Sequence, residues 1–403
     1  GAEIAGAFHV EVTAAAGHTA EEVEEAARVE IQGLRDNPPS PEEVARIQNR
    51  VEWQHVRQRA NIGGFGGRAN RLNSFNVFAG DPGLMNHDME RYLAVQPDDV
   101  SRVARDYLAE RQVQMVVLPE PSRSHASTAI DRTVQPSPST ARPFVPPVPQ
   151  RQRLANGLNL LVVEKRGLPA VAFGLLLNTG GARDPVALPG LAAFTTAMLQ
   201  EGTTARSSQQ IANEFEFMGS HLAAVNGRER TVLAAETLSR HLPKAMELMA
   251  DVVQNPTFPE REIDRVRSER LTSLRRMRDD PTALTGRVAA GLIYGRESSY
   301  GHPLSGNEDA LEALSREHLV DFFLGNYNPE SATFVAVGDV SMEEVMRLAE
   351  EYLGNWKPQG SRSETLDEAT NGSGPATTTL YLMDKPGAAQ SVIRFGLAGV
   401  PRR

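Results

Sequence analysis

The residue types that most often perform catalysis or bind metal ions are scattered widely along this chain. No two of its nine histidines are three or four residues apart, so no helix can present two imidazoles to one metal ion. These histidines are His9, His18, His55, His87, His125, His221, His241, His302 and His318. The chain has no cysteine, which excludes disulfides and cysteine-bound zinc. No serine stands in a nucleophile elbow, so hydrolysis by a serine or cysteine nucleophile is not supported.

The charged residues offer weaker candidates. Glu201 and Glu269 are isolated carboxylates, which we interpret as solvated. Residues 260–278 predict a helix that is rich in arginine, with Arg261, Arg265, Arg267, Arg270, Arg275, Arg276 and Arg278. The simpler interpretation is a solvated face paired with nearby acidic residues, and the alternative is a surface that attracts acidic peptides. We interpret His302, in the phrase GHPLSG, as structural, and His241 as a local cap or surface residue.

Composition limits the class of protein. A chain of 403 residues predicts two or three domains, and 40% hydrophobic with 23% charged residues is ordinary for a globular chain. The net charge of −9 argues against a nucleic-acid partner. No apolar run reaches 18 residues, so no transmembrane helix is expected. The glycine-rich residues 61–70 lack a following Gly-Lys-Ser/Thr, so we interpret them as a joint between helices or a site of close backbone packing.

Local signals predict the secondary structure. Thr19 and Ser40 begin capping boxes that start two helices, and Asn156-Gly157 and Asn226-Gly227 stand at the turns of two hairpins. The other predicted strands are residues 4–14, 113–118, 171–178 and 334–340. The other predicted helices are residues 98–108, 207–218, 242–253, 260–278 and 342–353. Strands, then helices, then one late strand favour an α+β fold.

One stretch stands out among the predicted helices. Residues 188–203, LPGLAAFTTAMLQEGT, predict a buried helix from residue 189 to 203. Pro189 suits its start, and Gly202 suits its C-terminal stop. Its apolar stripe consists of Leu191, Phe194 and Met198.

This stretch resembles the signature helix of the pitrilysin/insulinase zinc peptidases, peptidase family M16. That helix reads roughly GLAHFLEHMLFKGT and carries the inverted zinc motif H-x-x-E-H. The shared framework is Gly190, Leu191, Ala192, Phe194, Met198, Leu199, Gly202 and Thr203. The chemistry is not shared, because the two histidine positions hold Ala193 and Ala197 and the glutamate position holds Thr196.

The resemblance also locates a third ligand position. In the family, two imidazoles and a glutamate from a later helix bind zinc, and the motif glutamate acts as base on the zinc-bound water. The later glutamate precedes a phrase that resembles Asp-Asp-Pro, here residues 279–281, and its position is Ser273, 76 residues after Ala197. We therefore expect no catalytic residue and no metal ligand in this chain. The degenerate positions are Ala193, Thr196, Ala197 and Ser273.

The resemblance implies an α+β fold of repeated M16 (LuxS/MPP-like) two-layer domains, each an antiparallel-rich sheet packed by helices. On this basis residues 1–118 are the C-terminal part of an M16 domain that ends a first half. Residues 119–150 are a proline-rich linker. Residues 151–357 form a complete M16-like domain with a degenerate zinc motif, residues 358–376 are a second linker, and residues 377–403 begin a further, truncated M16 domain.

The resemblance also implies a function, because two M16 halves close around a peptide and one half carries the zinc. We predict a non-catalytic portion of an M16 zinc metallopeptidase, inactive alone, that contributes chamber wall and substrate contacts. Its expected partners are a peptide or unfolded polypeptide and the zinc-bearing half, in the same polypeptide or in a partner subunit. Zinc is expected in that half. The alternative is a peptidase-derived scaffold or binding protein without proteolytic activity. Bacterial members suggest a periplasmic or secreted location.

Overall fold

The computed structural model describes two compact units. Unit 1 comprises Gly1–Val51 and Asn61–Val148, and unit 2 comprises Glu52–Ala60 and Pro149–Arg403. The described residues are 8–12, 14, 18–63, 66–108, 115, 146–278, 280–296, 298–360, 379–384 and 391–397.

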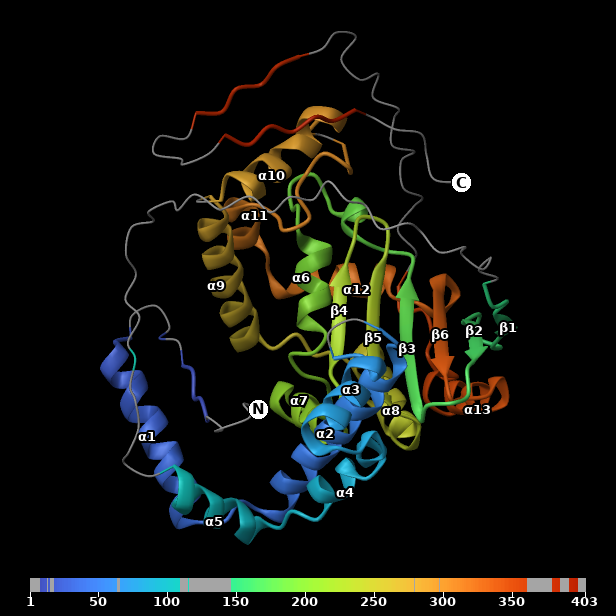
Figure 1. Ribbon diagram of the computed structural model, residues 1–403. Coiled ribbons are helices and arrows are strands. Elements are labelled where there is room, and N and C mark those ends of the chain that lie inside the picture. The colour runs from blue at the N-terminus through green and yellow to red at the C-terminus, as the bar shows by residue number, and fades with distance from the viewer. Residues whose placement is uncertain are drawn as a thin grey trace, which may run out of the picture. The chain divides into compact units, whose positions relative to one another are not determined.

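The described part of unit 1 is helical. Its elements are α1 (Ala20–Asp36), α2 (Pro41–Ala60, which continues into unit 2), α3 (Arg68–Ala79), the 3-10 helix η1 (Pro82–Asn86), α4 (Asp88–Leu93) and α5 (Pro97–Tyr107) (Figure 1). Both predicted capping boxes are confirmed: the Thr19 hydroxyl accepts from the Glu22 N–H, and the Ser40 hydroxyl from the Glu43 N–H. The strand predicted over residues 4–14 is wrong in its described part, which forms no strand.

The described part of unit 2 is built on one six-stranded sheet. Its strands are β1 (Gln150–Arg153), β2 (Asn159–Glu164), β3 (Ala170–Leu177), β4 (Leu222–Asn226), β5 (Thr231–Leu238) and β6 (Ala332–Gly338). Their order is β1-β2-β6-β3-β5-β4, and only β2 and β6 run parallel to each other. The sheet is therefore antiparallel-rich, and β4 forms one of its edges.

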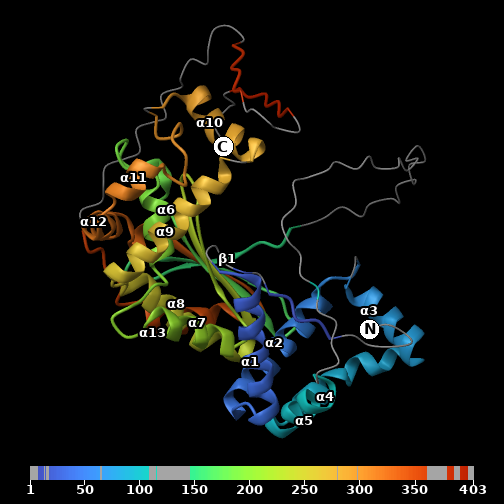
Figure 2. The same cartoon turned by 90° about the vertical axis from the view of Figure 1, so that its left-hand side faces the viewer.

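Helices cover the sheet of unit 2. Its α-helices are α6 (Leu191–Met198), α7 (Ser208–Phe217), α8 (Leu242–Gln254), α9 (Glu260–Met277), α10 (Pro281–Tyr294), α11 (Glu308–Ala313), α12 (Arg316–Asn326) and α13 (Met342–Leu353). Its 3-10 helices are η2 (Gly181–Arg183), η3 (Ser239–His241) and η4 (Pro329–Ser331). Figure 2 shows α6, α8, α12 and α13 on one side of the strands. Alternate residues of β3, such as Phe173, Leu175 and Leu177, are buried in one core with Phe194 and Met198 of α6. This is an α+β two-layer architecture.

Two predictions about elements need correction. The helix predicted from residue 189 to 203 is only Leu191–Met198, with Gly190 as its N-cap. Gly202 does not end it; Gly202 bridges to Ser207 in the following loop, because this segment pairs as extended chain. The predicted strand 113–118 and the linkers 119–150 and 358–376 lie almost wholly outside the described residues.

Two apolar segments near the C-terminus were expected to open a further domain. The described residues 379–384 and 391–397 form no strand. Within the described parts of the chain, no helix is both long enough and apolar enough to cross a membrane.

Candidate functional site

Asp184 fixes the start of α6. Its Oδ2 accepts a hydrogen bond from the Gly190 N–H and its Oδ1 one from the Ala192 N–H, each at 2.7 Å. Gly190 has a φ of 95°, and a Cβ there would lie 2.7 Å from the backbone of Gly306. Only glycine fits both conditions. The helix therefore begins packed against the GHPLSG loop.

Burial dominates the electrostatics of this helix start. It raises the pKa of Asp184 to about 7, although the backbone hydrogen bonds from Ala192 and Gly190, and the charge of Arg228, favour the ionised carboxylate. His302 is buried beside it, with Nε2 3.9 Å from Asp184 Oδ2 and 3.0 Å from the Gly181 carbonyl oxygen. His302 thus packs at the start of α6.

The two predicted histidine positions share the partly exposed face of α6. Ala193 and Ala197 are four residues apart and lie on this face, whereas Leu191, Phe194 and Met198 are buried. Helix α6 contacts α9, and Figure 1 shows the two side by side. The methyl groups of the two alanines provide no donor atom for a metal ion.

The predicted glutamate position belongs to the core. Thr196 is 1% exposed, and its hydroxyl donates to the Ala192 carbonyl oxygen at 2.8 Å. The same hydroxyl lies 3.0 Å from the Tyr327 hydroxyl, at the end of α12. Burial raises the pKa of Tyr327 to about 12, so this phenol stays neutral. Thr196 therefore links α6 to α12 through buried hydroxyls.

The predicted third ligand position lies on α9. Ser273 is exposed, and the next residue, Leu274, is buried in the core. One turn before Ser273, Arg270 reaches α6: its Nη2 donates to the Ala193 carbonyl oxygen at 2.9 Å. Its Cζ lies 5.4 Å from the centre of the Phe194 ring. Helix α9 therefore presents a cation to the alanine face of α6.

The environment of Arg270 does not favour its charge. Burial lowers the pKa of its guanidinium. Among the described residues, no carboxylate lies within ion-pair distance of Arg270, the criterion being 4.0 Å. Its interactions with α6 are one backbone carbonyl and one aromatic face.

The residues of this face do not fit a zinc ion. Zinc in proteins takes imidazole, thiolate or carboxylate ligands, and these four positions offer two methyl groups and two hydroxyls. No cluster of three or more histidine, cysteine, aspartate or glutamate residues suited to a metal ion occurs in the described part of the chain. His241 interacts with its neighbour in the chain. Its Nε2 accepts from Arg240 Nε at 3.2 Å, and burial lowers the pKa of its imidazole.

Three arginines of residues 260–278, namely Arg265, Arg267 and Arg278, pair with carboxylates, and one interpretation from the sequence is wrong. Arg265 forms ion pairs with Glu201, Glu262 and Glu269. The interpretation as a solvated carboxylate is wrong for Glu201, which is only 19% exposed, whereas Glu269 is 64% exposed. Arg278 pairs with Glu308 in the same manner. The pairing matches the simpler interpretation for these arginines.

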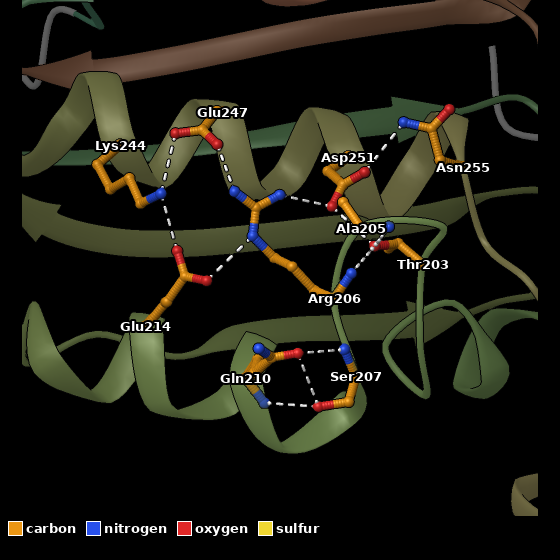
Figure 3. A network of polar contacts seen from close by, with 10 residues as sticks. All are labelled: Thr203, Ala205, Arg206, Ser207, Gln210, Glu214, Lys244, Glu247, Asp251 and Asn255. Atoms are coloured by element: carbon orange, nitrogen blue, oxygen red, sulfur yellow. Dashed lines mark hydrogen bonds and ion pairs between the residues drawn. The ribbon is translucent and has the colours of Figure 1, made fainter.

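A second polar centre, which we call the Arg206 cluster, was not predicted from the sequence (Figure 3). Arg206 donates to Glu214, Glu247 and Asp251 at 2.5–3.0 Å, and its side chain is 17% exposed. Lys244 pairs with Glu214 and Glu247, and the Thr203 hydroxyl donates to Asp251. The cluster joins the loop after α6 to α7 and α8. The helical spacings of Lys244, Glu247 and Asp251 were local signals for it.

Two family models match the chain. The model for insulinase (peptidase family M16) matches residues 160–291, which include α6 and most of α10. The model for the peptidase M16 inactive domain matches residues 313–402.

Curated relatives include zinc proteases. An uncharacterised zinc protease of Rickettsia felis is 29% identical over 214 residues, 53% of this chain and 52% of the relative. The mitochondrial-processing peptidase subunit beta of Bos taurus is 33% identical over 204 residues, 50% of this chain and 41% of the relative. This chain thus spans about half the length of the curated relatives it matches.

Solved structures share the fold. A peptidase M16 inactive domain from Pseudomonas fluorescens is 26% identical with a TM-score of 0.51, covering 54% of this chain and 53% of that one. The periplasmic protease PqqL from Escherichia coli is 20% identical with a TM-score of 0.50, covering 55% of this chain and 25% of that one. With both family models matching and zinc proteases among the relatives, this chain belongs to peptidase family M16.

Proposed function

We propose that this chain is a non-catalytic portion of an M16 metallopeptidase. It contributes chamber wall and contacts to a peptide, while zinc-dependent hydrolysis takes place in another half of the enzyme. The observation that carries this proposal is the joint replacement of four positions on α6 and α9. Ala193, Thr196, Ala197 and Ser273 supply no imidazole and no carboxylate.

The packing around these positions supports the proposal. Asp184 still fixes the start of α6 through two short hydrogen bonds, and Thr196 is joined to Tyr327 in the core. Both oxygens of Asp184 and the hydroxyl of Thr196 are thus hydrogen-bonded, as buried polar groups in native structures generally are. The arrangement fits a half that is maintained for its fold.

The sheet edge supplies a surface for an extended peptide. Strand β4 is the edge strand beside α6, and within the described residues no strand pairs with its other side. The Gly227 N–H donates to the Arg230 carbonyl oxygen. Because hydrogen-bonded pairs alternate along an antiparallel ladder, Ala224 and Asn226 direct their N–H groups away from β5. An extended peptide can pair with such groups irrespective of its sequence.

The first experiment measures zinc and proteolysis together. The purified chain is assayed for zinc by atomic emission and for cleavage of a quenched fluorescent peptide, alone and mixed with a zinc-bearing M16 half. The expected result is no stoichiometric zinc and no cleavage by the chain alone. Stoichiometric zinc together with cleavage by the chain alone would show that the proposal is wrong.

A second experiment tests peptide contact through β4. The A224P variant removes an outward N–H while leaving the hydrogen bonds to β5, and the matched control A224S keeps that N–H. Binding of a fluorescent unstructured peptide should weaken at least fivefold in A224P and little in A224S. Equal binding by both variants would remove β4 from the peptide-binding surface. No binding even by the unaltered chain would favour the scaffold alternative.

A further inference from the structure

Arg270 lies between the two positions that carry histidine in the zinc-binding members of the family. In an α-helix the carbonyl oxygen of residue i accepts from the N–H of residue i+4, so the Ala193 oxygen points toward Ala197 along the helix surface. The Arg270 Nη2 is 2.9 Å from this oxygen. The guanidinium therefore occupies the surface between positions 193 and 197.

The remaining contacts fix the guanidinium in that place. Its Cζ lies 5.4 Å from the Phe194 ring centre, and Phe194 is fully buried, so the ring is a rigid support. Arg270 projects from α9 one turn before Ser273, so it also adjoins the third position. One side chain of α9 thus contacts the turn of α6 that follows position 193, beside the third position on its own helix.

We propose that Arg270 is a fixed organic cation that joins α6 to α9 and excludes a metal ion from between positions 193 and 197. The positive charge of Arg270 then keeps a metal ion out, and the four positions also supply no metal ligand. A divalent cation placed there would meet a guanidinium that keeps its proton at any ordinary pH, because arginine is effectively never deprotonated in proteins. This inference rests on the proposed function for one point, which is that positions 193 and 197 correspond to the histidine positions of the family. The zinc-binding test does not depend on that correspondence.

The test installs a minimal metal site on the alanine face. Two histidines four residues apart on a helix bind Zn²⁺ by themselves, so A193H/A197H probes access to this surface. This pair is made in the Arg270 background and in the R270L background. A reference pair, R347H/E351H, is placed on the exposed face of α13, where Arg347 and Glu351 have the same spacing. Zn²⁺ affinity is measured by calorimetry for each variant.

The expected Zn²⁺ affinities differ between the histidine pair on α6 and the reference pair on α13. The A193H/A197H pair should bind Zn²⁺ at least tenfold more tightly in the R270L background than with Arg270 present. The R347H/E351H pair should bind equally in both backgrounds. The R270K background, which keeps the positive charge, should still bind several-fold more weakly than R270L.

Three outcomes would overturn the inference. The A193H/A197H pair could bind within threefold in both backgrounds, so that Arg270 excludes nothing. It could fail to bind in either background while R347H/E351H binds, so that another feature closes the surface. Finally, R270K could open the site as fully as R270L, so that charge is not the cause. Failure of the proposed function would appear separately, as stoichiometric zinc in the unaltered chain.

Discussion

Arg206 and Arg270 are both largely removed from solvent in unit 2, and they are bound in opposite ways. Arg206 donates to three carboxylates, and a lysine shares two of them. Arg270 instead contacts a backbone carbonyl and the face of a phenyl ring. A buried cation surrounded by carboxylates holds separate elements together, whereas one without a carboxylate gains little for its desolvation. The Arg206 cluster therefore has the character of a structural centre, whereas the contacts of Arg270 add less to the stability of the α6–α9 face.

The pKa values of buried acidic residues also differ between the two regions. Against the raising effect of burial, hydrogen bonds from Asn255, Arg206 and Thr203 hold the pKa of Asp251 below its ordinary value. At the start of α6, burial wins and raises the pKa of Asp184 to about 7. One region stabilises its charges with opposite charges, and the other depends mainly on backbone amides.

The largest expected effect comes from removing the paired arginine. R206M leaves Asp251 without its cationic partner and leaves Glu214 and Glu247 with Lys244 alone. It should lower the free energy of unfolding by about 3–5 kcal/mol. Urea unfolding followed by tryptophan fluorescence measures this effect. Both tryptophans of the chain, Trp53 and Trp356, are buried residues of unit 2, so the signal reports on that unit.

The matched control removes an arginine from an exposed pair. Arg347 is paired with Glu351 at the surface of α13, with exposed fractions of 61% and 50%. R347M should change the free energy of unfolding by less than about 0.5 kcal/mol. Equal effects of R206M and R347M would mean that the Arg206 cluster has no structural role.

The next effect depends on pH and tests the two carboxylates. The folded-state pKa of Asp184, about 7, lies above its unfolded value, so its contribution to stability is present in acid and is lost as the pH rises through 7. D184N removes this titration. The loss of stability caused by D184N should therefore be larger at pH 5 than at pH 8, by about 2 kcal/mol. Urea unfolding of the D184N and unaltered chains at both pH values measures this difference.

The effect of D251N on stability should have the opposite pH dependence, within the same unit. Because the pKa of Asp251 is lowered in the folded state, its stabilisation is present at neutral pH and is lost as the pH falls below its ordinary value of 3.8. The destabilisation by D251N should therefore shrink in acid. If both variants showed the same pH trend, the contrast between the two regions would be wrong.

Local interactions explain which parts of this structure the sequence could predict. The starts of α1 and α2 follow from capping boxes, because Thr19 and Ser40 find their partners three residues away. The turn at Gly157, with a φ of 91°, follows from its residue type. Such signals need no knowledge of the remainder of the chain.

Long-range contacts explain what the sequence could not predict. Asp184 fixes the start of α6, but Gly190 at that start is also packed against Gly306, which is more than one hundred residues away. The four candidate positions were located through the family motif, yet the cation between them comes from Arg270, 77 residues after Ala193. In the sequence Arg270 was one of seven arginines on a polar helix, and no pattern distinguished it from those that pair with carboxylates.

The smallest expected effect concerns the unpaired arginine itself. R270L removes one hydrogen bond to the Ala193 carbonyl oxygen and one cation–π contact with Phe194, the latter amounting to about 0.5–1 kcal/mol. It also removes the desolvation of a charge for which the described residues supply no carboxylate partner, and a leucine adds apolar contact with α6. These effects oppose each other, so the free energy of unfolding should change by less than about 1 kcal/mol, measured by the same urea unfolding as for R206M. A loss as large as that of R206M would mean that Arg270 is as much a structural centre as Arg206, and the distinction between the two regions would fall.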